Sequence, residues 1–180
     1  MPTNEFGYTP WGADLVRIAE PIATREPNRW APRARSIARN NGVDLTVDGR
    51  LVKAVVHRGA DASVAHIEFG QMPPATARAV GELIGSAGEP DEEVHRNATG
   101  SGHHPGPVID NCDCSCTARS TMCVHVLATL YALAAAIDLD PRIALRLQDF
   151  GDRPGAALED DAVIPQWIPL TAFDSRSYYG

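Results

Sequence analysis

The stretch Cys112-Asp-Cys114-Ser-Cys116, followed by Cys123-Val-His125, contains all four cysteines of the chain. Thiolate and imidazole groups at such close spacing are typical ligands of a tetrahedral Zn²⁺ ion. The pairs Cys114-x-Cys116 and Cys123-x-His125 each offer two ligands for neighbouring corners of a tetrahedron. Three sulfurs and one nitrogen fill the coordination sphere, which indicates a structural zinc site without an open position for catalysis.

Three other interpretations of these cysteines compete with structural zinc. Disulfides are one, but Cys-x-Cys neighbours are poorly placed to bridge each other. Chance clustering is the second. Catalytic zinc is the third, but the chain lacks a His-Glu-x-x-His helix and the His-x-Glu, Pro-Cys-x-x-Cys signature of deaminases. Cys112 is a surplus thiol, which can replace Cys114 as a ligand or remain free.

The remaining sequence predicts an α+β fold, in which a small antiparallel β-meander has flanking helices and a zinc knuckle leads into a buried α-helix. Alternating apolar residues, with a hairpin signal at Asp48-Gly49-Arg50, predict the strands of the meander. Strands are expected at 43–48, 51–57, 63–69 and 108–116. Apolar residues at helical spacing predict helices at 13–19, 73–86, 123–137 and about 141–148.

The chain divides into four predicted parts. Residues 1–86 form an N-terminal α+β part, and residues 87–107, which are rich in Gly, Pro and acidic residues, form a flexible linker. Residues 108–150 hold the zinc finger and the helices that follow it. Residues 151–180 are expected to be an irregular tail with several aromatic residues.

The cysteine and histidine pattern resembles the SWIM zinc finger, in which Cys-x-Cys is followed by a variable gap and Cys-x-His. The short gap and the Ala/Leu-rich helix after it are similar to the bacterial branch of this family. Further similar segments are Phe6-Gly7, Thr9-Pro10-Trp11-Gly12, the Arg-rich 32–39, Ile137–Pro141 and Leu145–Leu147. The resemblance implies a DNA-binding or protein-interaction module that accompanies a Swi/Snf-type helicase-like ATPase. It also favours a strand over a helix at 34–39.

Charge is unevenly distributed along the chain. The net charge of −7 means that bulk electrostatics does not draw the protein to nucleic acid. Residues 1–80 hold ten basic and eight acidic residues, whereas residues 81–180 hold six and fifteen. One basic cluster is therefore the predicted contact with DNA. It consists of Arg25, Arg29, Arg33, Arg35 and Arg39.

No catalytic motif stands out, so we expect a non-enzymatic, zinc-binding adaptor with a helicase-like ATPase as its protein partner. The alternative is a pure protein-interaction module without nucleic-acid contact, and a zinc hydrolase is a distant third. Residues 120–137 carry no formal charge apart from His125, but this run is short for a bilayer span of about 20 residues. We therefore expect no membrane partner. The clustered cysteines and the absence of a signal-peptide pattern at residues 1–5 predict a cytoplasmic protein.

Overall fold

A computed structural model describes residues 6–22, 28–87, 89–118 and 120–151 of the chain. Arg25 and almost all of the predicted C-terminal tail lie outside the described residues. The elements in chain order are α1 (Pro10–Ala19), α2 (Ala31–Arg39), β1 (Val43–Asp48), β2 (Leu51–Arg58), β3 (Asp61–Phe69), α3 (Pro74–Ala87), α4 (Glu92–Gly100), β4 (Ile109–Cys114), α5 (Val124–Leu139) and α6 (Arg142–Arg146). The predicted α+β fold is confirmed, with an antiparallel sheet, flanking helices and a cysteine cluster before a helix.

The sheet has the strand order β1-β2-β3-β4, and every neighbouring pair is antiparallel. The first three strands form the predicted meander, and β4 returns to pair with β3 after the chain has passed through α3 and α4. Apolar side chains that alternate along β2 and β3 are fully buried on one face of the sheet. They are Val52, Ala54, Val56, Ala65, Ile67 and Phe69.

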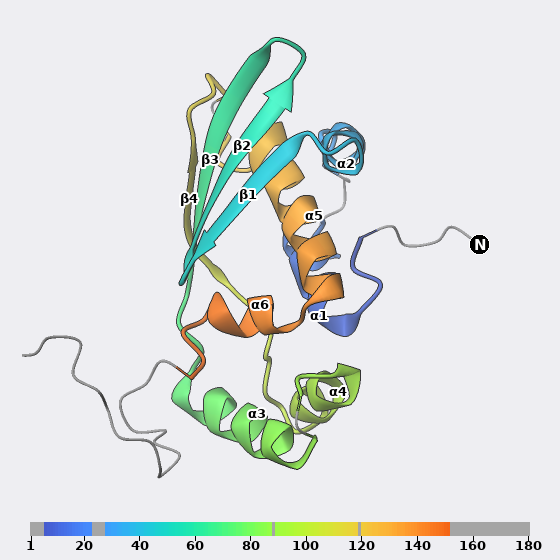
Figure 1. The fold of residues 1–180 in the computed structure, drawn as a ribbon, viewed down its shortest axis with the longest axis vertical. Coiled ribbons are helices and arrows are strands. Elements are labelled where there is room, and N and C mark those ends of the chain that lie inside the picture. Colours follow the sequence, from blue (N-terminus) through green and yellow to red (C-terminus); the bar gives the residue numbers. More distant parts are fainter. Residues whose placement is uncertain (1–5, 23–27, 88, 119, 152–180) are drawn as a thin grey trace, which may run out of the picture.

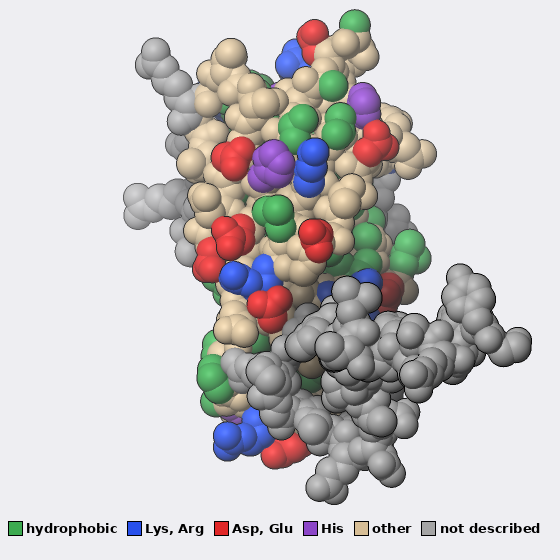
Figure 2. Space-filling view, turned by 60° about the vertical axis from the view of Figure 1, so that its left-hand side comes forward, with side chains coloured by type: hydrophobic (Ala, Val, Ile, Leu, Met, Phe, Trp, Pro, Cys, Tyr) green, Lys and Arg blue, Asp and Glu red, His purple; other side chains and the backbone are tan. Residues whose placement is uncertain are grey.

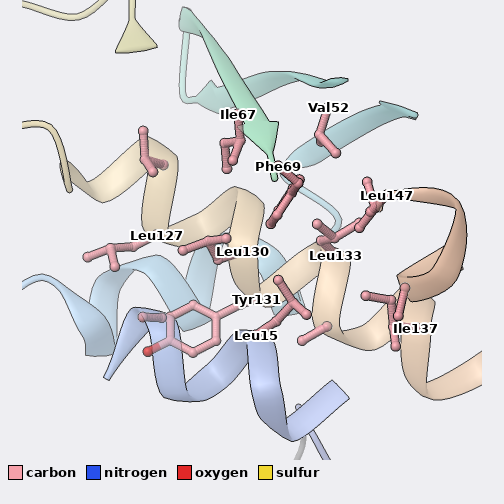
Figure 3. Close-up of a cluster of buried hydrophobic side chains, with 14 of the residues drawn as sticks. Leu15, Val52, Ile67, Phe69, Leu127, Leu130, Tyr131, Leu133, Ile137 and Leu147 are labelled. Carbon is pink, nitrogen blue, oxygen red and sulfur yellow. The ribbon is translucent and has the colours of Figure 1, made fainter. Parts of the chain in front are cut away.

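Helix α5 lies between the inner face of this sheet and the pair α1 and α2 (Figure 1). Its side chains are buried almost all the way round, as expected for a helix whose sequence is apolar on every side. Figure 3 shows Leu130 and Leu133 of α5 near Phe69 of the sheet, while Tyr131 lies near Leu15 of α1. The helix therefore joins two layers, and both of its ends are positioned by them.

The C-terminal end of α5 is attached to the segment that precedes α1. The Asp138 carboxylate accepts hydrogen bonds from the backbone N–H of Gly7 at 2.7 Å and of Thr9 at 2.9 Å. It also accepts one from the Thr9 hydroxyl at 2.7 Å, and that hydroxyl oxygen caps α1 by accepting from the Gly12 N–H at 3.1 Å. Gly7 has a φ of +69°, a left-handed backbone conformation that glycine adopts readily. The glycine at position 7 and the threonine at position 9 therefore have a physical role, which is to bring their donors to the Asp138 carboxylate.

Residues 34–39 form part of a helix, so the strand favoured for them by the family resemblance is wrong. Pro32 lies in the first turn of α2, where its missing N–H costs nothing. Ala31 and Ala34 are buried three residues apart, and Ile37 continues the same row toward the core. Residues three apart lie on the same side of a helix, so this spacing is helical, and the arginines of the segment lie outside that buried row.

The prediction of a flexible linker over 87–107 is wrong for its central part, because residues 92–100 form α4. The carboxylate of Asp91 caps the helix by accepting from the Val94 N–H at 2.8 Å, and Glu92 and Glu93 complement the helix dipole in the first turn. Val94 and Ala98 are buried in the same hydrophobic cluster as the sheet and α5. The acidic run is thus a helix start, and α4 packs against α3 and α1.

Candidate metal centre

The candidate metal centre is built where β4 ends and α5 begins. Residues 112 and 114 of β4 point to the same side of the sheet because side chains alternate along a strand. Cys114 pairs with Ala65 of β3 in the strand register, and the next residue, Ser115, also bonds to β3. Ser115 donates its N–H to the Val64 carbonyl and accepts the Val64 N–H on its hydroxyl oxygen, both at 2.9 Å. The knuckle that carries the first two ligands is therefore fixed to the sheet.

The other two ligands come from the first residues of α5. Cys123 is the N-cap of the helix, and its carbonyl accepts the Leu127 N–H at 3.0 Å. His125 lies two residues later, in the first turn, and its carbonyl accepts the Thr129 hydroxyl at 2.9 Å. Both residues are buried, whereas Cys114 and Cys116 are half-buried at the surface of the knuckle.

The ligand atoms of Cys114, Cys116, Cys123 and His125 all lie within 4.8 Å of one another. The Cys114 Sγ and the His125 Nδ1 are 3.7 Å apart. A tetrahedral ion with metal–sulfur bonds of about 2.3 Å requires its sulfur ligands to be separated by about 3.8 Å. The four side chains are thus positioned to bind a metal ion, and the donor set of three sulfurs and one nitrogen is compatible with zinc.

The protonation of the thiols in the metal-free cluster is unequal. Burial raises the pKa of Cys114 to about 12, and the neighbouring Cys123 adds to the effect. Burial acts in the same direction on Cys116, but hydrogen bonds from the Ala118 backbone and from Cys114 and Cys123 outweigh it and lower the pKa of Cys116. Cys116 is therefore more ready to ionise than Cys114, which keeps its proton until a metal displaces it.

His125 is favoured in its neutral, metal-binding form. Burial lowers the pKa of this imidazole, and the positive charges of Arg58 and Arg33 lower it further. The two arginines come from different elements, the end of β2 and the first turn of α2. They were not expected to lie near the metal centre, because nothing in the sequence relates their positions to each other.

Cys112 is outside the group of four. Its thiol lies 3.8 Å from the carbonyl oxygen of Thr121, and its pKa is raised by burial and by the nearby Cys123 and Asp113. All four cysteines have free thiols, so the competing disulfide interpretation has no support. The sequence register that uses Cys112 in place of Cys114 is thus not the one that brings the ligand atoms together.

Three described members of the predicted arginine cluster, Arg29, Arg33 and Arg35, do not share one side of α2. Arg33 and Arg35 are two residues apart in α2, which separates them by about 200° around the helix axis. The half-exposed Arg35 is already paired, since its guanidinium binds Glu20 and lies 5.4 Å from the centre of the Tyr131 ring. Arg29 lies instead over the Trp30 ring at 4.9 Å. Nucleic-acid contact through these residues stays a prediction.

A second polar group, which the sequence did not reveal, lies between α1 and α4. His95 is buried against Trp11, and its Nε2 is 2.7 Å from a carboxylate oxygen of Asp14. The pair borders a shallow hollow of about 440 Å³, together with Arg17, Thr99 and the loop from His104 to Pro107. Asp14 also pairs with Arg17, so its charge is balanced within the described structure and the group fastens α4 to α1.

No protein-family model, curated protein or solved structure matches this chain. Identity as a SWIM protein therefore stays a proposal that depends on the ligand pattern and its geometry. Among the residues that the structure describes, no helix has the length and apolar character needed to cross a bilayer. Helix α5, which holds most of the uncharged 120–137 run, is buried by the sheet and by α1 and α2.

Proposed function

We propose that this chain is a non-enzymatic, zinc-binding adaptor of the SWIM type. It serves nucleic-acid transactions in the cytoplasm beside a Swi/Snf-type helicase-like ATPase. The observation that carries the proposal is the convergence of one imidazole and three thiol ligand atoms within 4.8 Å. The SWIM pattern of Cys-x-Cys and Cys-x-His supplies this ligand set, with one pair at and just after the end of β4 and the other at the start of α5.

Zinc is the metal that best fits the donors. Thiolates are soft ligands that select Zn²⁺ over Mg²⁺ and Ca²⁺, and a four-coordinate sphere of three sulfurs and one nitrogen is typical of structural zinc. Bound there, the ion would supply a fixed tetrahedral link between the end of β4 and the start of α5. Such a link contributes directly to folding free energy.

A structural role follows from the number of protein ligands. Four side chains complete a tetrahedral sphere, so no position is left for a metal-bound water, which a zinc hydrolase needs. X-ray absorption spectroscopy of the purified chain should fit three sulfurs and one nitrogen around zinc. A fit that required an exchangeable oxygen would instead favour the hydrolase.

A pure protein-interaction module is the second candidate function. It is favoured by the net charge of −7 and by the ion pair between Arg35 and Glu20, which leaves fewer arginines free for phosphate groups than the sequence alone suggests. In this case the acidic chain would bind only its protein partner. The two candidates share the zinc site and differ in whether the isolated chain binds nucleic acid.

The test is affinity purification of the tagged full chain from its native cells, with metal analysis of the purified protein. We expect about one zinc per chain and a helicase-like ATPase among the co-purified proteins. The variant Cys123→Ser should lose both, whereas Cys112→Ser is the matched control and should keep both. Zinc-free wild-type protein would contradict the metal assignment, and zinc-loaded protein with no ATPase in repeated purifications would contradict the adaptor role.

A further inference from the structure

Two exposed arginines, Arg33 and Arg58, flank the metal centre. Arg33 is in the first turn of α2, and Arg58 is the last residue of β2 at the hairpin to β3. Helix α2 packs against both α5 and β2, and the His57 N–H donates to the Gly42 carbonyl at 2.8 Å just beyond the end of α2. The β2–β3 turn, α2 and the start of α5 therefore share one end of the molecule, opposite α3 and α4 (Figure 1).

Neither guanidinium has an acidic partner among the described residues. Asp61 is opposite Arg58 across the hairpin in the strand register, but the two side chains form no ion pair. The acidic residues Asp44, Asp113 and Glu20 have other basic partners, namely His57, His66 and Arg35. Four other arginines on the described surface, Arg17, Arg50, Arg142 and Arg146, form ion pairs with carboxylates, whereas the exposed Arg78 and Arg96 form none that the structure shows. Within the described part of the chain, Arg33 and Arg58 thus place two unpaired guanidinium groups beside the metal centre, which with Zn²⁺ and three thiolates would itself carry only one net negative charge.

An exposed tryptophan adjoins this charge. Trp30 is the N-cap residue of α2, three residues before Arg33, and 37% of its surface remains exposed. The Arg29 guanidinium lies over its ring at 4.9 Å, so the ring is already part of a surface stack with a cation. An accessible indole among arginines is the combination on which unpaired bases stack while their phosphates bind the guanidinium groups.

The outer face of the sheet offers no comparable surface. Figure 2 shows this side of the molecule, where acidic, basic and histidine side chains are interspersed. Along the strands, Lys53 and His66 are cross-strand neighbours, and Asp113 follows on β4 within 3.5 Å of His66. Charges of both signs cancel there at short range, so a polyanion gains little from that face.

We propose that single-stranded nucleic acid binds across Trp30, Arg29, Arg33 and Arg58. Its phosphates pair with Arg33 and Arg58, and one base stacks on Trp30. This inference rests on the proposed function and assigns its nucleic-acid surface, with Arg35 excluded because Glu20 and Tyr131 occupy it. A duplex holds its bases inside the stack and cannot use the indole, so single strands bind more tightly than duplexes of the same length.

The test uses the zinc-loaded full chain and fluorescence anisotropy with a labelled DNA strand of about 20 nucleotides, alone and as a duplex, in about 50 mM salt. Replacing both Arg33 and Arg58 with Ala should weaken single-strand binding by roughly tenfold or more. It should also reduce the slope of log K against log salt by about 1.4, since each single-strand phosphate contact contributes about 0.7. Trp30→Ala should weaken single-strand binding while leaving duplex binding unchanged, and Trp30→Phe should restore part of it.

The matched control replaces Arg78 of α3 and Arg96 of α4, which removes the same charge from exposed positions at the opposite end. This control should bind as the wild type does. Equal losses in the two double variants, or no binding of any strand by the wild type, would overturn the inference. Zinc content and thermal unfolding measured on the same samples separate this failure from failure of the proposed function. Zinc-loaded, folded protein without nucleic-acid binding leaves the protein-interaction module standing.

Discussion

The two ends of α5 are fastened by opposite means. At its start, Cys123 and His125 lie close to Cys114 and Cys116, and a bound metal ion would link the four side chains. At its end, Asp138 is already held by N–H and O–H donors from the Gly7–Thr9 segment. With the metal centre of the proposed function, one end of the helix depends on a metal ion, whereas the other is held by the protein alone. Changes at the two ends should therefore have different metal dependence.

The largest effect is expected at the start of the helix. Cys123→Ser removes a buried ligand, and structural zinc in small fingers contributes about 10 kcal/mol or more of apparent binding free energy. We expect loss of zinc and unfolding of the β4–α5 junction, visible as a lower Tm in far-UV circular dichroism. Strong chelation of the wild type should reproduce the change, and Cys112→Ser should not. An unaltered melting curve after verified zinc loss would show that the ion does not hold this junction.

The next effect is expected at the other end. Asp138→Ala leaves the N–H groups of Gly7 and Thr9 and the Thr9 hydroxyl without their acceptor in a buried environment. Each orphaned buried donor costs about 1 to 3 kcal/mol, so we expect a loss of about 3 to 5 kcal/mol in urea unfolding. The loss should be the same with and without zinc. Asp140→Ala, two residues later, is the control and should cost about 1 kcal/mol, because that partly exposed carboxylate only accepts from the Arg142 N–H and pairs with the exposed Arg146.

The two ends also differ in how far the sequence alone could predict them. The four candidate ligands lie close together in the chain and their spacing is itself the signal, so the sequence alone selected the four residues whose ligand atoms the structure brings together. The contact between Gly7 and Asp138 spans 131 residues, and no local pattern relates a glycine at one end to a carboxylate at the other. The Phe6–Gly12 segment stands out in the sequence only by its family resemblance, and its contact with Asp138 becomes evident only in the folded structure.

The same distinction explains the errors in secondary structure. Strands with strict apolar alternation, such as Val43–Asp48, were predicted with the bounds that the structure has. Residues 34–39 of α2 were predicted as a strand because the family resemblance favoured that element, and the short row of small buried residues, Ala31 and Ala34, is a weak helical signal among arginines. Helix α4 was read as linker because its buried side is only Val94, His95 and Ala98, and it becomes stable through packing on α1 and α3.

Acidity should weaken the metal-dependent end first. In the metal-free cluster Cys114 carries a proton, since its pKa is raised to about 12, and zinc must displace it. Displacing one proton makes the binding constant fall about tenfold for each pH unit of acidification, and further ligand protons steepen this slope. Zinc affinity measured by competition with a chromophoric chelator should therefore fall by about a hundredfold or more from about pH 8 to about pH 6. A pH-independent affinity would mean that the thiols are not the ligands.

The smallest expected effects come from two glycine-to-alanine changes, which distinguish close packing beside Asp138 from intrinsic helix propensity. Gly12 and Gly81 are both inside helices, α1 and α3, where alanine is intrinsically favoured by about 1 kcal/mol. A Cβ at Gly12 would lie 2.2 Å from the Asp138 Oδ1 and 3.0 Å from the Ala134 carbonyl oxygen, whereas a Cβ at Gly81 would make only an ordinary contact with Phe150 at 3.9 Å. We expect Gly12→Ala to destabilise by about 2 kcal/mol, because relieving the clash must move α1 away from α5 and stretch the bonds to Asp138. Gly81→Ala should stabilise by about 0.5 kcal/mol. Urea unfolding should therefore give free-energy changes of opposite sign for the two variants. The same sign for both would mean that the close approach of α1 to the end of α5 does not require a glycine at residue 12.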